Sequence, residues 1–423
     1  MSLNRAGLIG IIAFAGSTGL LPLAVGALLL LPALVVSFVK IFEGSLRFNT
    51  KSLTAFVAAT LWIAMIWISS FTGGLTEYHS EDSFQSALRF TGSFVIFVMA
   101  YSMGQRDVPF LLFGFVVVSA LHAAIAIGQS YLGLAANIHG QDRASGALTP
   151  NVLSNLLGFG LICWVALWVQ LIPNSVGRRK LVVTGVLIAA GMVVAGTLKN
   201  IVVLAAILSA YYVLSSKREI VPRAILFVTV LILASPLIPM SERIVLRALD
   251  SFRTLFSYLG WVPSFSSTVE ATDSLLWRYR HWELLISDWM QNHFLTGSGI
   301  GQARNMAGVR AFYNEDATAH SDWVAVMVEG GALFMPIWAG CVLIIYLCVF
   351  SAVKRVGERH LFILLLTYLY FIMIAGNVVY TIPFLYFLWA LMGVLLVPQN
   401  LSKRVPFPSP DIHLRSQFQR GTE

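Results

Sequence analysis

The chain has 423 residues, of which 57% are hydrophobic and only 11% are charged, and its mean hydropathy is +0.79. Apolar runs long enough to cross a bilayer recur along its whole length, which excludes an ordinary soluble domain and predicts a polytopic membrane protein. The net charge of +8 would suit a nucleic-acid-binding protein, but in a membrane protein the side on which the charge lies decides its meaning.

The predicted fold class is all-α, a polytopic membrane helix bundle of about twelve spans. The spans are 7–20, 22–39, 53–71, 88–103, 108–134, 152–172, 181–197, 199–214, 223–240, 322–353, 360–376 and 379–397. The first two are separated at Gly19 and Pro22, which interrupt a helix. Arg5 precedes a long apolar stretch without a small-residue cleavage site, so we expect the first helix to be retained.

This threading divides the chain into spans 1–9 (1–240), a large and mostly helical outer loop between spans 9 and 10 (241–320), spans 10–12 (321–400) and a tail (401–423). With both termini cytoplasmic, the inner segments hold 18 of the 28 Lys and Arg residues but only 6 of the 20 acidic residues. Basic residues concentrate on the cytoplasmic side of membrane proteins, so this asymmetry supports the threading. The positive charge is therefore expected to meet anionic lipids, not nucleic acid.

The outer loop has two predicted helices. In 241–261 apolar residues recur at helical spacing between arginines, which predicts a helix on the membrane surface. A second helix is predicted over 277–294 and ends at the glycine-rich "LTGSGIG". Because "GSGIG" follows a helix and not a strand, it is not interpreted as a dinucleotide-binding fingerprint. The returning segment 322–353 is longer than a bilayer core of ~30 Å requires, and "EGG" with Pro336 predicts a break in it.

His320 lies at the outer water interface, just before this returning helix, with Thr318 or Ser321 as the candidate cap. The helix dipole disfavours an imidazolium there, whereas Glu315 and Asp322 favour it, so the sequence leaves the charge state open. A neutral imidazole would suit a general base that takes a proton from a hydroxyl group. Taken alone, an interfacial histidine with a water shell is the favoured interpretation of this position.

Basic residues on the same side form a second group. Arg278 and Arg280 lie among aromatic residues in "WRYRHW", as in an interfacial aromatic belt, but guanidinium geometry also matches phosphate oxygens. Lys199 interrupts "GMVVAGTLKNIVVLAAIL", where it either faces a polar cavity or extends to the surface. Arg143 and Asn151 belong to "QDRASGALTPNVLSNLL", a loop-to-helix junction in which Asn151 supports a turn.

No metal site or catalytic nucleophile is predicted. Cys163, Cys341 and Cys348 fall inside apolar segments, as small buried hydrophobic residues do. The histidines show no metal-ligand spacing, and no Ser–His–Asp arrangement stands out. His122, inside an apolar span, is predicted to be packed and hydrogen-bonded.

In this order the segments resemble the O-antigen ligase and polymerase superfamily of bacterial envelope glycan enzymes. "RASGALTPNVLSNLL" resembles its Arg-x-Ser-Gly … Pro-Asn segment, and "RYRHW" followed by "GSGIGQ" resembles its Arg-x-x-x-Trp and Gly-x-Gly segment. "HSDWVAVMVEGG" resembles its histidine segment, which ends in a glycine pair. The resemblance covers most of the chain and points to Arg278. Many members, ligases above all, carry an arginine where this chain has Lys199, which resembles the lysine of some exopolysaccharide polymerases.

The resemblance implies a GT-C-like membrane enzyme that needs no metal and no other cofactor. Such enzymes move a glycan from an undecaprenyl-pyrophosphate carrier to an acceptor hydroxyl at the periplasmic face of the bacterial inner membrane. By this resemblance, the catalytic residues are His320, Arg278 and Lys199, and the substrate-binding residues are Arg280, Arg143, Asn151, Asp322 and Glu315.

The expected partners are the lipid-linked donor, a glycan or lipid A–core acceptor, membrane lipids, and a chain-length regulator or other envelope glycan protein. A polysaccharide polymerase is slightly favoured over an O-antigen ligase because of Lys199. A polytopic transporter or flippase of lipid-linked glycans is the alternative from another class. It would place ionisable residues near the bilayer midplane and often shows duplicated halves, whereas here the charges gather in the outer loop.

Overall fold

The computed structural model describes residues 3–44, 46–74, 80–103, 107–134, 136–138, 141–143, 146–168, 175–195, 200, 203–205, 207, 253–254, 256–261, 274–307, 309, 318–374, 376, 378 and 382–398. The predicted spans 199–214 and 223–240, most of the predicted surface helix and the tail 401–423 lie largely or wholly outside these residues. Within the described ranges the chain is helical apart from short turns and one small hairpin.

The N-terminal helices are α1 (Leu3–Ser17), α2 (Leu23–Ala27), the 3-10 turn η1 (Leu28–Leu30), α3 (Leu31–Phe42), α4 (Thr50–Gly74), α5 (Ser80–Ser102) and α6 (Val108–Tyr131). They are followed by the antiparallel hairpin β1 (Ala136–Ile138) and β2 (Gln141–Arg143), then by α7 (Pro150–Ala166) and α8 (Ser175–Val194). The later elements are α12 (Ser274–Asn292), the 3-10 turn η5 (Ala303–Asn305), α14 (Asp322–Ala352), α15 (Val356–Met373) and α16 (Ile382–Leu396).

Six helical stretches among the described residues are long and apolar enough to cross a membrane. They are Val25–Phe42, Thr50–Thr72, Glu81–Ser102, Val108–Tyr131, Asp322–Ala352 and Val356–Met373. Three shorter apolar helices accompany them: Pro150–Ala166, Leu181–Val194 and Pro383–Leu396. The described helices follow the predicted segments, including the break between α1 and α2 at Gly19, whose φ is 81°. The polytopic, helical character is thus confirmed, whereas the total of twelve spans stays a prediction.

The short helix α16 lies in the centre of the bundle. Every residue from 383 to 397 is buried, as expected for a helix that is hydrophobic on all sides. Its rings stack into neighbouring helices: Trp389 lies 4.8 Å from Trp62 of α4, and Phe387 lies 3.8 Å from Phe115 of α6, between ring centroids. By contrast, Val57, on α4, and Leu347, on α14, are about 60% exposed (61% and 58%), as lipid-facing side chains would be.

Hydrogen bonds and ion pairs identify the two ends of the bundle. At one end, Arg5 of α1 pairs with Asp107 before α6 at 2.8 Å, and Lys51 of α4 donates to the carbonyl of Ser351 in α14 at 2.6 Å. We call this the basic end, because the described Lys and Arg residues there are Arg5, Lys40, Arg47, Lys51, Lys354, Arg355 and Arg359. This grouping agrees with the charge asymmetry expected for a cytoplasmic face.

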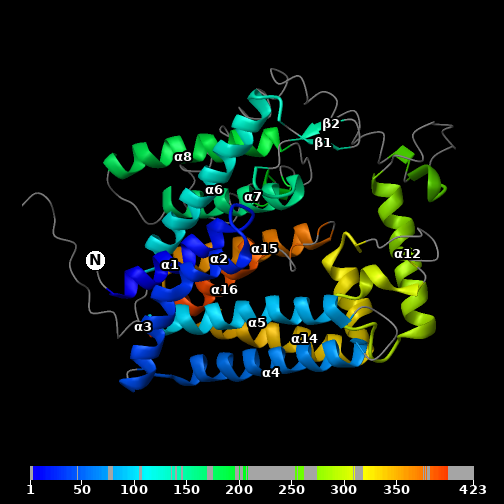
Figure 1. Ribbon diagram of the computed structural model, residues 1–423, viewed down its shortest axis with the longest axis horizontal. Helices are drawn as coiled ribbons and strands as arrows, with labels where there is room; N and C mark the ends of the chain where they lie inside the picture. The colour runs from blue at the N-terminus through cyan, green and yellow to red at the C-terminus, as the bar shows by residue number, and fades with distance from the viewer. Residues whose placement is uncertain are drawn as a thin grey trace, which may run out of the picture.

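The opposite end is covered by α12 and the segments that follow it. In Figure 1, α12 runs across the end of the layer formed by α4, α5 and α14 and lies nearly perpendicular to those helices. We call the described residues 274–307, 309 and 318–330 the cap. The cap has its own apolar cluster, distinct from that of the bundle, to which Leu285 and Met306 contribute fully buried side chains. Val328 of α14 also belongs to it, so the first part of α14 packs with the cap.

Candidate active site in the cap

Helix α14 is interrupted at Gly331, as "EGG" predicted. Gly331 has φ 64° and ψ −178°, which is not helical, and the helix continues beyond it to Ala352. The part after the break is about 20 residues long, or ~30 Å, which matches the thickness of a bilayer core. The part before the break, from Asp322 to Gly330, belongs to the cap. The predicted division of this long segment is therefore confirmed.

The glycine-rich turn after α12 fills the break in α14. A helix break leaves backbone groups without their usual partners, and in a membrane protein such groups must be satisfied by other protein groups. Four backbone hydrogen bonds do this: Ser298 N–H to Val328 O (2.9 Å), Gly299 N–H to Glu329 O (3.1 Å), Ala332 N–H to Phe294 O (2.9 Å) and Leu333 N–H to Leu295 O (3.0 Å). Gly297 and Gly331 meet so closely that a Cβ on Gly331 would lie 2.3 Å from the nitrogen of Gly297.

His320 lies where the chain enters this first part of α14. Its φ of 51° makes it the one non-glycine residue with a positive φ among the described residues. Such a backbone costs energy of the order of 1 kcal/mol and is enriched at functional sites. Ser321 is the N-cap of α14, and its Oγ accepts from the N–H of Val324 at 3.4 Å. His320 therefore directly precedes the N-cap residue Ser321 and lies just outside the first turn of α14.

Aromatic residues of α12 hold this junction. The Trp277 ring meets the His320 ring edge-on, with centroids 5.2 Å apart and an interplanar angle of 78°. On its other side, Trp277 stacks at 5.0 Å on His281, one helical turn further along and fully buried. The indole N–H of Trp282 donates to the carbonyl of Ala319 at 2.7 Å. The imidazole of His320 is thus positioned by contacts from a neighbouring rigid helix.

The two arginines of α12 have different surroundings. Arg278 follows Trp277 directly and is half-buried. Arg280 is exposed, and its guanidinium lies 5.0 Å from the centroid of the Tyr258 ring. Glu283, one turn further along α12, raises the pKa of the Tyr279 phenol through a hydrogen bond and its negative charge. Arg278 is thus the more buried of the two arginines, and the role of either one in a site stays a prediction.

The other predicted site residues are distributed as follows. Lys199 and Glu315 lie outside the described residues, and Arg143 ends strand β2 with its side chain outside the description. Asn151 is in the first turn of α7. Asp322 is fully buried, and its Oδ2 accepts from the N–H of Val378 at 2.5 Å. That bond connects the start of α14 to the segment between α15 and α16, and the predicted role of Asp322 in substrate binding stays a prediction.

The predictions for histidine and cysteine can also be compared with the structure. His122 is fully buried, with its Nε2 3.0 Å from the carbonyl oxygen of Gly16, so the packed and hydrogen-bonded interpretation is confirmed. The three cysteines are free thiols inside helices. Of the residues that the structure describes, no three His, Cys, Asp or Glu side chains converge as a metal ion would require.

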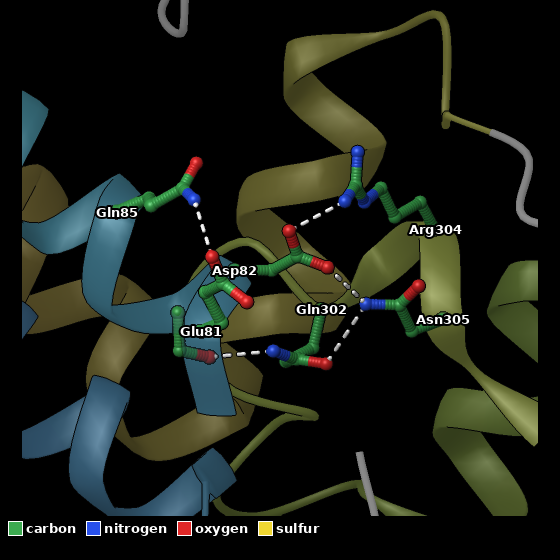
Figure 2. A network of polar contacts seen from close by, with 7 residues as sticks. Glu81, Asp82, Gln85, Gln302, Arg304 and Asn305 are labelled. Carbon is green, nitrogen blue, oxygen red and sulfur yellow. Dashed lines mark hydrogen bonds and ion pairs between the residues drawn. The ribbon is translucent and has the colours of Figure 1, made fainter. Parts of the chain in front are cut away.

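A polar network that the sequence did not indicate fixes the cap to the bundle (Figure 2). The carboxylate of Asp82, in the first turn of α5, pairs through Oδ1 with Arg304 at 2.5 Å and through Oδ2 accepts from the Asn305 amide at 2.9 Å. The amide of Gln302 donates to the hydroxyl of Ser83 at 2.7 Å. These bonds join segments more than 200 residues apart in the chain, so no local sequence pattern could predict them.

No model of a known protein family matches this chain, and no curated protein matches it. The candidate site is therefore defined by its geometry. A histidine with a strained backbone, an arginine on the adjoining helix and a locked glycine turn lie together at one end of a helical membrane bundle. This arrangement can offer a base to a hydroxyl group and a fixed positive charge to an anionic leaving group.

Proposed function

We propose that this protein is a membrane glycosyltransferase that moves a glycan from an undecaprenyl-pyrophosphate carrier to an acceptor hydroxyl. The observation that carries the proposal is the convergence of two motif regions in the cap. "WRYRHW" with "GSGIG" forms α12 and its turn, "HSDWVAVMVEGG" forms the His320 junction and the first part of α14, and the two are bonded to each other. These are segments that carry the resemblance to the O-antigen ligase and polymerase superfamily.

The proposed reaction needs a base, an acceptor and a stabilised leaving group. The acceptor oxygen attacks the anomeric carbon of the donor sugar, and the bond from that carbon to the pyrophosphate oxygen breaks. His320 takes the proton of the acceptor hydroxyl, and undecaprenyl pyrophosphate leaves with the bonding electron pair. Arg278 and Lys199 supply positive charge to the pyrophosphate, which makes a metal ion unnecessary for neutralising it. The contacts of Trp277 orient the imidazole for this step.

The proposed setting is the bacterial inner membrane, with the cap in the periplasm and both termini in the cytoplasm. One observation supports that orientation. The basic residues named above for the basic end lie opposite the cap, and basic residues concentrate on the cytoplasmic side of membrane proteins. A polysaccharide polymerase is favoured over a ligase because of Lys199.

The experiment that tests this function is the glycan profile of a strain that lacks the protein. Rescue with wild type is compared with rescue by His320→Asn, since Asn tolerates a positive φ but is no base at neutral pH. We expect His320→Asn to lower transfer at least ~100-fold, because general bases contribute that much or more. His360→Asn, near the basic end, is the matched control and should rescue fully. Full rescue by His320→Asn, with normal protein amounts throughout, would remove His320 from the mechanism.

The same profile separates the candidate activities. Surface lipid with single repeat units, or a lost secreted polymer with intact ligation, indicates a polymerase. Bare lipid A–core with long glycan retained on its undecaprenyl carrier indicates a ligase. Single lipid-linked repeat units trapped on the cytoplasmic face would indicate a flippase and would contradict the proposal.

A further inference from the structure

A polar cleft of about 170 Å³ opens at the end of the bundle beside the His320 junction. Its walls are the first turns of α5, the segment 301–304 at the start of η5, the two residues before His320, and the first part of α14. The polar side chains that line it are those of Asp82, Gln85, Ser86, Arg89, Arg304, Thr318 and Glu329. The wall formed by Thr318 and Ala319 makes this cleft the immediate neighbour of His320 along the chain.

Most charged groups of the cleft already have protein partners. Arg304 pairs with Asp82, whose second oxygen accepts from Asn305. Glu329 accepts from the N–H of Ala303 at 3.2 Å. For Arg89, in contrast, no described carboxylate lies within ion-pair distance. Arg89 is therefore the cation of the cleft whose charge no described carboxylate pairs with.

The position of Arg89 makes this charge unusual. It lies in the third turn of α5, within the stretch Glu81–Ser102 that is long and apolar enough to cross a membrane. A charged residue in such a stretch is costly, and it commonly faces a polar cavity and marks a substrate site. Behind it, the hydroxyl of Tyr386 lies against Gly92, one turn further along α5. A neutral hydroxyl cannot neutralise a guanidinium, and the two carboxylates that line the cleft, Asp82 and Glu329, are not within ion-pair distance of Arg89.

The lining of the cleft indicates the kind of ligand. Guanidinium, amide and hydroxyl groups are donors that match the oxygens of a carboxylate or a phosphate, and a guanidinium can bind either through two parallel hydrogen bonds. Because the cleft is next to His320 along the chain, a ligand bound in it would belong to the part of the acceptor that is close to the reacting hydroxyl group. We propose that the cleft binds a sugar of the acceptor that bears an oxyanion, a carboxylate or a phosphate, with Arg89 as the main partner of that anion. This inference rests on the proposed function and identifies its acceptor as an acidic glycan.

The test measures binding of three small probes to the purified full-length protein in lipid nanodiscs. The three probes differ at the sixth carbon. In glucose this carbon bears a hydroxyl group, in glucuronate it is the carboxylate carbon, and in glucose 6-phosphate it bears a phosphate. We expect wild type to bind one of the two acidic sugars about 10-fold or more tightly than glucose, as a charge-assisted hydrogen bond allows. The tighter of the two identifies the anion. Arg89→Gln should reduce the preference to near unity, and Arg89→Lys should retain part of it.

Arg47→Gln is the matched control, because it removes the same charge from an exposed position at the basic end and should keep the full preference. Equal binding of glucose and both acids, an acidic preference that persists in Arg89→Gln, or no binding of any probe would each overturn the inference. Binding of the probes does not require catalysis, so the test can contradict the acidic subsite without contradicting the transferase, and the reverse. An anion preference in a protein whose deletion leaves the glycan profile normal would contradict the transferase alone. A changed profile without any preference would contradict the acidic subsite alone.

Discussion

The two ends of the bundle use charged residues in different ways. At the basic end, each ion pair joins only two side chains: Arg5, 37% exposed, pairs with Asp107, and Arg355, 61% exposed, pairs with the buried Glu358 three residues away. At the cap end, Asp82 joins two residues more than 200 positions away, and Glu329 and Asp322 are buried. The His320 backbone is also strained there.

This difference separates orientation from chemistry. Exposed charges at helix ends decide which way a membrane protein faces and contribute little to its stability. Buried polar groups and strained backbones are expensive, and proteins keep them where a site needs fixed geometry. The cap end therefore has the character of a functional site, whereas the basic end has that of an orienting face.

The largest loss of stability is expected when the glycine-rich turn at 294–299 is separated from α14. In Gly331→Ala, the new Cβ would lie 2.3 Å from the nitrogen of Gly297, at a backbone φ of 64° that alanine adopts poorly. We expect a loss of about 4 kcal/mol or more in the free energy of unfolding, or no folded protein, because the four backbone bonds of the break are also disrupted. Thermal unfolding and size-exclusion chromatography of the purified variant measure this.

Gly340→Ala, on the same helix, is the matched control. A Cβ there meets no atom within 4 Å, so this variant should unfold as wild type does or slightly later, since alanine favours a helix by up to about 1 kcal/mol. An unchanged unfolding temperature for Gly331→Ala would mean that the interlocked turn does not stabilise the protein.

A smaller loss of stability is expected when an aspartate is replaced by asparagine, and the same replacement can be compared at the two ends. Asp82→Asn removes the charge that Arg304 and Asn305 share, and we expect it to cost about 1–3 kcal/mol of stability. Asp107→Asn removes the charge that pairs with Arg5, and we expect at most about 1 kcal/mol, since this carboxylate has a single side-chain partner and Arg5 is 37% exposed. Equilibrium unfolding of the two variants in the same detergent makes the comparison. Equal losses would contradict the distinction drawn between the ends.

The smallest effect is expected for Lys51→Gln. Lys51 is exposed and donates to a carbonyl at the end of α14, so its loss should change the free energy of unfolding by no more than about 0.5 kcal/mol. A reporter fused to the tail should show the same orientation as wild type, because other basic residues remain at that end. A larger loss of stability would assign the basic end a structural role.

Local signals in the sequence predicted much of this architecture. Apolar runs predicted the helices, "EGG" predicted the break at Gly331, and the pattern of 277–294 predicted α12. The charged surroundings of His320 at the start of an apolar helix were also visible in the sequence, whereas its positive φ was not, and its catalytic role stays a prediction. Each of these signals is carried by neighbours in the chain, which is why a pattern could detect it.

What the sequence could not predict depends on distant pairs. Nothing near "GSGIG" indicated that its N–H groups would satisfy carbonyls of α14, because glycine turns have many uses. Arg89 gave no signal, since an arginine near a helix end usually extends to the surface, and only the cleft gives it another meaning. Asp322 is predicted to bind substrate, which stays a prediction, and the sequence did not indicate that its Oδ2 would accept from a backbone N–H of the segment before α16.

The interlock of the glycine turn with α14 also has a consequence for biogenesis. The turn at 294–299 is synthesised before the residues 328–333 that it must meet, so at first it has none of these hydrogen-bond partners. Until then, 322–352 satisfies its own backbone best as one unbroken helix, which is also the form in which a segment enters a bilayer. The bend at Gly331 is therefore expected to form late, after insertion, and the cap would complete a helix that is already in the membrane.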